Sequence, residues 1–238
     1  MAAFRPDDGR LAAARDRLSA LRVDPVADPM LAVEPTGNCP DEADYVVFTS
    51  KTGAELVADD WEPGTATVVA IGPKTADALE AAGYTVDVVP EEFSSAGLVE
   101  TLADRVAGAA VEVARSDHGS PVLPEGLRDA GAMVHETVLY RLVRPDDSGD
   151  SAEAAATGDL DAVCFTSSLT VEHFLDAAAE RGIRANAVEG LNAAVVGVIG
   201  EPTRETAGSH GIAVDVVATE ATFETLARET VARLDADR

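Results

Sequence analysis

Two copies of a short polar motif offer hydroxyl groups at the ends of predicted strands. Phe48-Thr49-Ser50 recurs as Phe165-Thr166-Ser167, and each copy ends an apolar run and precedes a helical pattern. Hydroxyls at this place can hydrogen-bond a ligand, and the free N–H groups of the next helix can hold an anion. Either copy alone is explained as an ordinary helix N-cap. The presence of two copies in equivalent positions is the observation that favours ligand binding.

A second repeated motif, Ile-Gly-x-x-Thr, also marks a turn from strand to helix. Gly72 and Gly200 allow backbone amides to approach a ligand closely, and Thr75 and Thr203 fall in the first helical turn. The motif is neither a dinucleotide fingerprint nor a P-loop, because the further glycines and the Gly-Lys-Ser/Thr sequence are missing. Each half therefore presents two helix starts that favour an anion, without machinery for phosphate transfer.

The elements that must position these motifs alternate between strand and helix. Such alternation predicts an α/β fold with parallel sheets covered by helices on both faces. The predicted strands are 2–5, 45–49, 67–71, 85–89, 111–115, 134–143, 162–166, 194–199 and 213–217. The predicted helices are 10–21, 73–82, 96–106, 125–130, 171–181, 202–210 and 223–234. The polar stretch 144–158 is expected to be a surface loop with a helical turn at 152–156.

The order of the motifs indicates a duplicated module. Residues 70–75 align with 198–203, and the same offset pairs 86–89 with 214–217 without a gap. Ligands of open parallel sheets bind at the carboxyl ends of the strands. We therefore expect the function to lie in a cleft between the two copies.

The charge balance is strongly acidic. The 238 residues carry 43 Asp and Glu against 18 Lys and Arg, a formal net charge of −25, and only Lys51 and Lys74 are lysines. The acids are dispersed among apolar periods, which argues against a disordered tail and against mimicry of nucleic acid. Adaptation to high salt, as in a halophilic organism, is the favoured interpretation. No nucleic-acid partner is expected.

Several classes of protein find no support in the sequence. No secretory leader and no membrane-length apolar run is visible, so we expect a protein of the cytoplasm without a membrane partner. Cys39 and Cys164 are expected to be unpaired thiols. A hydrolase elbow is missing. A metal site is not expected, because the histidines show no paired ligand spacing. These are His118, His135, His173 and His210.

Taken in order, these motifs resemble the uroporphyrinogen-III synthase family over essentially the whole chain. Further matching segments are Arg5-Pro6, the pattern from Ile71 to Gly83, Ala114-Arg115-Ser116 and Val138-Leu139-Tyr140-Arg141. The resemblance implies two flavodoxin-like parallel-sheet domains joined by a two-stranded extended linker. It implies a discontinuous domain of residues 1–36 plus 143–238 and an inserted domain of residues 37–142.

The resemblance also implies a reaction. Hydroxymethylbilane, a linear tetrapyrrole with many carboxylates, loses its terminal hydroxyl as water, its last ring is inverted through a spiro intermediate, and the macrocycle closes without a cofactor. The substrate is the expected partner, and a monomer is our working expectation. By motif match, Tyr140 is the candidate general acid, although a core position is usual for tyrosine. The implied substrate-binding residues are Arg5, Thr49, Ser50, Gly72, Thr75, Arg115, Thr166, Ser167, Gly200 and Thr203.

An alternative and some departures accompany this hypothesis. A non-catalytic bilobal sensor or binding protein of the same fold is the main rival, although no effector domain is apparent. Lys51-Thr52-Gly53 and Ser168-Leu169-Thr170 replace a segment that often reads x-Asn-Gly in the family, and Glu201 places an acid beside the second glycine turn. The stretch from Ser116 to Gly119 stands where the family has a more basic turn. The first-half turn at Gly72 therefore keeps the anion-friendly pattern better.

Overall fold

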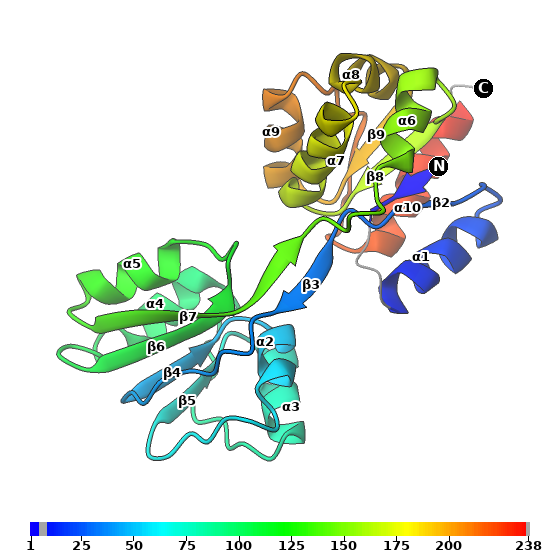
Figure 1. Ribbon diagram of the computed structural model, residues 1–238. Helices are drawn as coiled ribbons and strands as arrows, with labels where there is room; N and C mark the ends of the chain where they lie inside the picture. The colour runs from blue at the N-terminus through cyan, green and yellow to red at the C-terminus, as the bar shows by residue number, and fades with distance from the viewer. Residues whose placement is uncertain (5–8, 237–238) are drawn as a thin grey trace. The chain divides into compact units, whose positions relative to one another are not determined.

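The computed structural model describes residues 1–4 and 9–236 of the chain (Figure 1). The chain folds into two compact units. Unit 1 consists of Met1–Ala32 and Val143–Arg238, and unit 2 consists of Val33–Leu142. Unit 1 is therefore discontinuous in sequence, and unit 2 is inserted into it.

Unit 2 contains a five-stranded sheet in the order β3-β7-β6-β4-β5. Its strands are β3 (Ala32–Pro35), β4 (Tyr45–Phe48), β5 (Thr67–Ala70), β6 (Ala110–Ser116) and β7 (Met133–Val143). β4 pairs in parallel with β5 and β6, and β6 pairs in parallel with β7. The carboxyl ends of these four strands therefore share one edge of the sheet.

Helices cover both faces of this sheet, as Figure 1 shows. They are α2 (Lys51–Leu56), α3 (Pro73–Ala81), α4 (Ser95–Leu102) and α5 (Val122–Asp129). α2 and α3 bury Ala54 and Leu79 against Phe48 of β4 on one face. α4 and α5 bury their leucines against the valines of β4, β5 and β6 on the other. The alternation of side chains along each strand produces these two cores.

Unit 1 contains a second five-stranded sheet, in the order β10-β9-β8-β1-β2. Its strands are β1 (Ala2–Ala3), β2 (Val26–Ala27), β8 (Ala162–Phe165), β9 (Val195–Val198) and β10 (Val216–Val217). All four pairings between them are parallel. The short strand β1, next to β8, is the element that brings the N-terminus into this unit.

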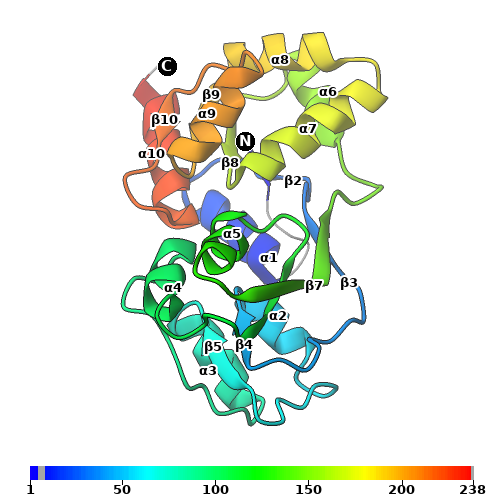
Figure 2. The ribbon, with the colours of Figure 1, turned by 90° about the vertical axis from the view of Figure 1, so that its left-hand side faces the viewer.

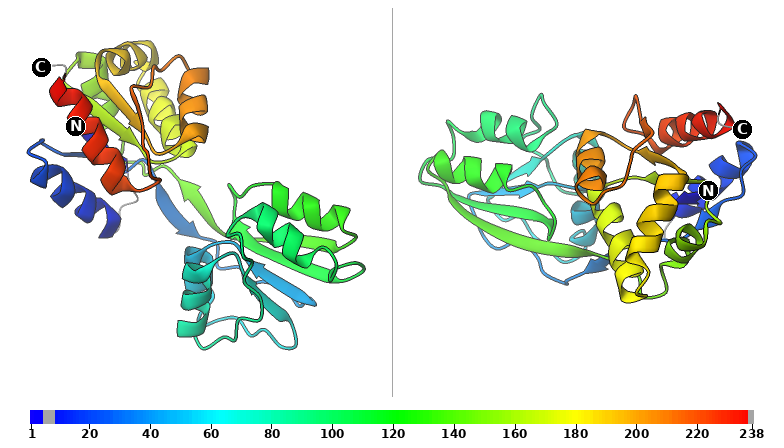
Figure 3. Two further views of the ribbon diagram at one scale, coloured as in Figure 1. Left: turned by 180° about the vertical axis from the view of Figure 1, so that it is seen from behind. Right: turned by 90° about the horizontal axis from the view of Figure 1, so that it is seen from above.

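Two groups of helices enclose the unit 1 sheet. One face carries α6 (Asp150–Thr157), α7 (Ser168–Glu180), α8 (Arg184–Ala193) and α9 (Glu201–Ser209), which gather in Figure 2. The aromatic rings of Phe4, Phe165 and Phe174 meet in this core, with centroids 5.0 to 5.8 Å apart. The other face carries α1 (Gly9–Ala20) and α10 (Phe223–Ala236), blue and red in Figure 3.

Most predicted elements are present, but two predicted strands are mostly irregular. Residues 85–89 contribute only a single bridge between Val88 and Val69, and 213–217 shortens to β10. The Asp87 carboxylate accepts the Val68 N–H at 2.8 Å, and Asp215 accepts the Val196 N–H at 2.9 Å. A side-chain oxygen thus takes the place of a ladder carbonyl at the equivalent point in both units.

Three helical segments differ from expectation. α8 is not expected from the sequence, α5 starts three residues before the predicted 125–130, and α6 extends the helical turn predicted inside 144–158. The α6 N-terminus is held by buried Asp28, which accepts the Gly149 and Ser151 N–H groups at 2.8 Å each. A partner from a distant part of the sequence therefore makes this helix possible. Over the described residues, no helix combines the length and apolar character needed to cross a membrane.

Candidate functional site

The carboxyl edge of unit 2 has a topological switch point between β4 and β6. From β4 the chain passes through α2 to β5 on one side, and from β6 it passes through α5 to β7 on the other. Ligands of open α/β sheets bind outside the strands at such points. Thr49, at the end of β4, bridges the switch point by donating its hydroxyl hydrogen to the Ala114 carbonyl at 3.2 Å.

Ser50 and Tyr140 lie together at this edge. The Tyr140 hydroxyl, from near the carboxyl end of β7, donates to Ser50 Oγ at 3.0 Å. Ser50 is the N-cap of α2 and also accepts the Gly53 N–H at 3.0 Å. Tyr140 is 7% exposed, with its ring packed in the α2–α3 core. A buried core position and a polar position were expected as alternatives for Tyr140. Both descriptions apply, because the ring is buried and the hydroxyl donates to the N-cap residue Ser50.

The Arg115 guanidinium forms an ion pair inside unit 2. Its side chain is 9% exposed, and Nη1 pairs with Glu136 Oε2 at 2.8 Å. Nε donates to the Ser116 carbonyl, and a Cβ on Gly119 would clash with Nη2. The guanidinium therefore holds the turn after β6 in place. Its expected role as a carboxylate partner stays a prediction, and a substrate carboxylate would have to share this cation with Glu136.

A shallow depression of about 370 Å³ lies at the start of α3. Thr75 lines it and is 3% exposed, and its hydroxyl has no hydrogen-bond partner among the described residues. Phe93 covers Gly72, where a Cβ would come within 3.2 Å of Phe93 Cβ. Phe93 is itself 61% exposed. The site therefore combines a buried free hydroxyl, a helix N-terminus and an exposed aromatic ring.

The two lysines of the chain lie at the starts of neighbouring helices, and one of them reaches this depression. Lys51 is the first residue of α2 and Lys74 the second of α3, and both line a groove between the two helices. Lys51 pairs with Glu55 at 3.1 Å. Lys74 also lines the Thr75 depression and makes no ion pair within the described chain. Glu55 and Asp77 line the same groove, so Lys74 at the start of α3 is the cation that favours an anion here.

Asp117 places an acid on the same edge. Its carboxylate accepts from His118 Nδ1 at 2.8 Å and from the Leu142 N–H at 3.0 Å. Burial raises the pKa of this carboxyl, but the two hydrogen bonds outweigh burial and hold the pKa below the usual range of an aspartate. Asp117 is therefore occupied in tying the turn after β6 to the end of β7.

Unit 1 repeats the arrangement at its own carboxyl edge. Thr166 follows β8 and donates its hydroxyl to the Phe4 carbonyl at 2.7 Å, as Thr49 does to Ala114 in unit 2. Ser167 caps α7 through a capping box with Thr170. The helix N-cap expected as the alternative explanation is therefore real at both Ser50 and Ser167. Arg5, which follows Phe4, lies outside the described residues.

The second glycine turn lacks the features that surround Gly72. Gly200 is the N-cap of α9, and Thr203 is 3% exposed, like Thr75. However, a Cβ at Gly200 would meet only Pro202, at 4.0 Å, and Glu201 pairs with Arg204 in the first turn. No aromatic cover and no lysine accompanies this turn within the residues described. The two copies therefore differ in the groups they present.

Comparison with known proteins agrees with this arrangement of motifs. The family model described as uroporphyrinogen-III synthase HemD matches residues 12–228. The chain belongs to the uroporphyrinogen-III synthase family. A protein of Methanothermobacter thermautotrophicus with a provisional uroporphyrinogen-III synthase name is 35% identical over 182 residues, covering 72% of this chain and 71% of that protein. A uroporphyrinogen-III synthase of Synechococcus elongatus is 30% identical over 55% of this chain and 53% of that protein.

Solved structures of this synthase family share the fold. A mutant uroporphyrinogen III synthase from the extremely thermophilic bacterium Thermus thermophilus superposes with a TM-score of 0.67 at 18% identity, covering 100% of this chain and 99% of that chain. At this identity the likeness concerns the fold alone. It supports the mixed α/β architecture with parallel sheets that the sequence predicted.

Sequence reasoning missed two residues of the site. Phe93 lies outside both repeated motifs, and only its place before the Ser94 cap of α4 gave a local signal. Lys74 lies inside the Ile-Gly-x-x-Thr motif. It is one of only two lysines in an acidic chain, and this rarity was the sequence signal that could have identified it.

Proposed function

We propose that this chain catalyses the uroporphyrinogen-III synthase reaction, in which hydroxymethylbilane loses water and closes with inversion of its last ring. The single observation that carries the assignment is the match of the family model to residues 12–228. The residues at the unit 2 edge suit a polycarboxylate substrate, because they offer a cation, a helix N-terminus and a free hydroxyl in one place. The product feeds the synthesis of haem and related tetrapyrroles.

The α3 start is the proposed carboxylate site. Lys74 supplies the charge, Thr75 supplies a hydroxyl whose hydrogen is not used within the described protein, and Phe93 lies against a pyrrole ring of the substrate. Because the Thr75 hydroxyl is buried without a partner among the described residues, a bound carboxylate oxygen satisfies a polar group that is otherwise costly to bury.

Tyr140 is the proposed general acid. Loss of the substrate hydroxyl requires a proton, and the phenol can donate it so that water leaves. Ser50 Oγ, 3.0 Å away, can then turn its own hydrogen toward the phenolate that remains. Thr49 and Thr166 hold strand ends together through their hydroxyl hydrogens and present only lone pairs to a ligand. The proposed binding roles of Ser167, Gly200 and Thr203 rest on their equivalence to the unit 2 positions.

Positioning is the larger part of the proposed catalysis. Hydroxymethylbilane can close without inversion when no enzyme is present, so the protein must mainly hold one fold of the substrate. Well-oriented reacting groups gain up to about 7–11 kcal/mol from positioning alone. No cofactor is needed for loss of water and ring closure.

The finer fold assignment is also a proposal. Unit 1 has the parallel order β2-β1-β8-β9-β10, which matches the flavodoxin-like pattern when its strands are counted in chain order. Unit 2 has the same neighbours in circularly permuted order, with β4, β5, β6 and β7 in the places of β8, β9, β1 and β2. β3 and β7, which contain the boundaries between the units, are the proposed two-stranded linker.

The acidity supports a working environment rich in salt. With a net charge of −25 and Lys74 as a free local cation within the described chain, an anionic substrate binds best where long-range repulsion is screened. The Debye length is about 3 Å at 1 M salt, so contacts at the site outweigh the net charge. We propose a monomeric enzyme of the cytoplasm of a salt-adapted cell.

The isomer composition of the product tests the activity. Hydroxymethylbilane is incubated with the folded protein, and the porphyrins are oxidised and separated. Formation of the type III isomer above the level in a protein-free control supports the assignment. Type I alone rejects it.

A further inference from the structure

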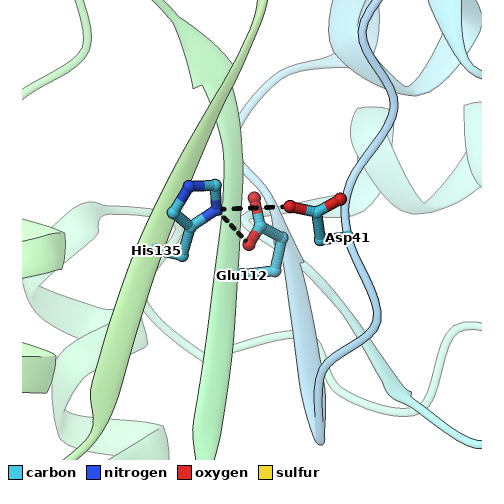
Figure 4. Close-up of side chains that lie close together, drawn as sticks. All are labelled: Asp41, Glu112 and His135. Atoms are coloured by element: carbon cyan, nitrogen blue, oxygen red, sulfur yellow. Dashed lines mark hydrogen bonds and ion pairs between the residues drawn. The ribbon is translucent and has the colours of Figure 1, made fainter.

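A second cluster of functional side chains lies at the amino end of the unit 2 strands. Asp41, Glu112 and His135 come from the loop before β4, from β6 and from β7, and they converge in Figure 4. Glu112 and His135 are direct neighbours in the β6–β7 register. Tyr140 and Ser116 lie toward the other end of the same two strands, so this cluster is separate from the carboxyl edge.

The geometry of the cluster is close to that of a metal site. One ligand atom from each residue lies within 4.8 Å of the other two. His135 Nδ1 is 2.7 Å from Glu112 Oε2 and 4.0 Å from Asp41 Oδ2. Ligands at about 2.0–2.2 Å from a tetrahedral zinc ion are about 3.4 Å from one another. To bind zinc, the His135–Glu112 distance must lengthen and the His135–Asp41 distance must shorten, each by roughly 1 Å or less. The Asp41 side chain is 81% exposed and is free to move.

The charge of the cluster favours a divalent cation. Glu112 is 2% exposed, and a buried carboxylate is stable only when it is paired or coordinates a metal. Its partners are the Thr137 hydroxyl and the His135 ring. His135 Nδ1 faces carboxylate oxygens of both Glu112 and Asp41, so this nitrogen lies where the cluster would hold a cation. A proton and a metal ion compete for that nitrogen.

The surroundings leave room for the rest of a coordination shell. A depression of about 220 Å³ opens on all three residues, and Glu42 and Met133 also line it. Water can therefore complete the coordination of an ion held by three protein ligands. One imidazole and two carboxylates suit zinc or a similar first-row ion, whereas magnesium and calcium prefer oxygen ligands alone.

We propose that Asp41, Glu112 and His135 bind one Zn²⁺ ion in unit 2. The ion joins the loop before β4 to the amino ends of β6 and β7. α2 and α3 cover the β4–β5 part of this sheet face, whereas Glu112 lies next to the exposed His135. The proposed role of the ion is structural, because it links three segments of unit 2. The ligands are far apart in the sequence, so the spacing of the histidines could not predict the site.

Titration calorimetry of the chelator-treated intact protein with ZnCl₂ tests this proposal, with MgCl₂ as the comparison ion. We expect one Zn²⁺ per chain and an increase in the thermal unfolding midpoint that Mg²⁺ does not reproduce. Asp41→Asn and His135→Gln change exposed side chains, so both variants are expected to fold. Each is expected to weaken Zn²⁺ binding by about tenfold or more. Glu42→Gln, which removes a neighbouring acid of the same depression, is expected to bind as the wild type does.

Two results overturn the proposal. One is the lack of saturable Zn²⁺ binding at neutral pH, which would leave the cluster as a protonated histidine between two acids. The other is an equal effect of Asp41→Asn and Glu42→Gln, which would mean that zinc binds only diffusely to an acidic surface.

Discussion

The Tyr140 hydroxyl donates a hydrogen bond of 3.0 Å to Ser50 Oγ, which also accepts the N–H of Gly53 at the start of α2. The phenol thereby meets the carboxyl edge at a helix cap rather than ending in the apolar core. After Tyr140 has given up its proton, the Ser50 hydroxyl can donate a hydrogen bond to the phenolate oxygen. This pair supports the proposal that Tyr140 is the proton donor.

Tyr140→Phe is expected to lower kcat by about 10- to 100-fold, because the phenol proton is lost while the ring remains packed. KM is expected to change little. Steady-state kinetics of hydroxymethylbilane consumption measure both values. Ser50→Ala is the companion variant, which removes the N-cap and costs about 1 kcal/mol in the free energy of unfolding. An unchanged kcat in Tyr140→Phe removes Tyr140 from the mechanism.

Thr75→Val is expected to weaken substrate binding without loss of stability. The Thr75 hydroxyl is buried and makes no hydrogen bond within the described protein, so its replacement by a methyl group is neutral or stabilising by roughly 1 kcal/mol. Thr230→Val is the matched control, since this buried hydroxyl donates to the Leu226 carbonyl at 2.7 Å inside α10. The control is expected to lose about 1 kcal/mol in urea unfolding and to bind substrate normally. A destabilised Thr75→Val would show that its hydroxyl serves the fold.

Lys74→Gln is expected to raise KM by about two- to fivefold at low salt, because a free cation leaves the carboxylate site. The effect is expected to shrink in molar salt, where exposed charges are screened. Lys51→Gln serves as the comparison, since Lys51 already pairs with Glu55. Equal effects of the two substitutions on KM at low salt would show a general loss of positive charge and no specific site at α3.

Asp117 predicts a pH-dependent contribution to stability. Its folded pKa lies below the ordinary value of an aspartate, so its hydrogen bonds stabilise the protein fully above that ordinary value, and this stabilisation is lost as the pH falls through the folded pKa. The stability difference between wild type and Asp117→Asn is therefore expected to be largest at neutral pH and to shrink in acid. Urea unfolding at a series of pH values measures it. A difference that grows toward low pH would contradict the assignment.

The positions of the repeated turns could be predicted from the sequence, but the side-chain contacts around them could not. The Thr-Ser and Gly-x-x-Thr motifs predicted strand ends followed by helices at Ser50, Gly72, Ser167 and Gly200, because caps and turns depend on local chemistry. The pairing of Arg115 with Glu136 joins neighbouring strands and leaves no local signal. The same limit applies to Phe93 over Gly72, since the loop that carries Phe93 is positioned by packing.

Local sequence patterns also failed to predict the length of some strands and the full extent of helix α6. The valines at 85–89 predict a strand, but Asp87 replaces part of the backbone ladder with its side chain. α6 forms where Asp28, more than a hundred residues earlier in the chain, holds its N-terminus. Such partners are visible only after the chain has folded.

The isomer ratio formed from hydroxymethylbilane in molar salt tests the central claim most directly. The folded wild-type protein, heat-denatured protein and buffer alone receive the same freshly made substrate, and the oxidised porphyrins are separated. We predict type III as the main product with folded protein only, and less of it per unit time with Tyr140→Phe. Type I alone in all three reactions would contradict the assignment of this chain as a uroporphyrinogen-III synthase.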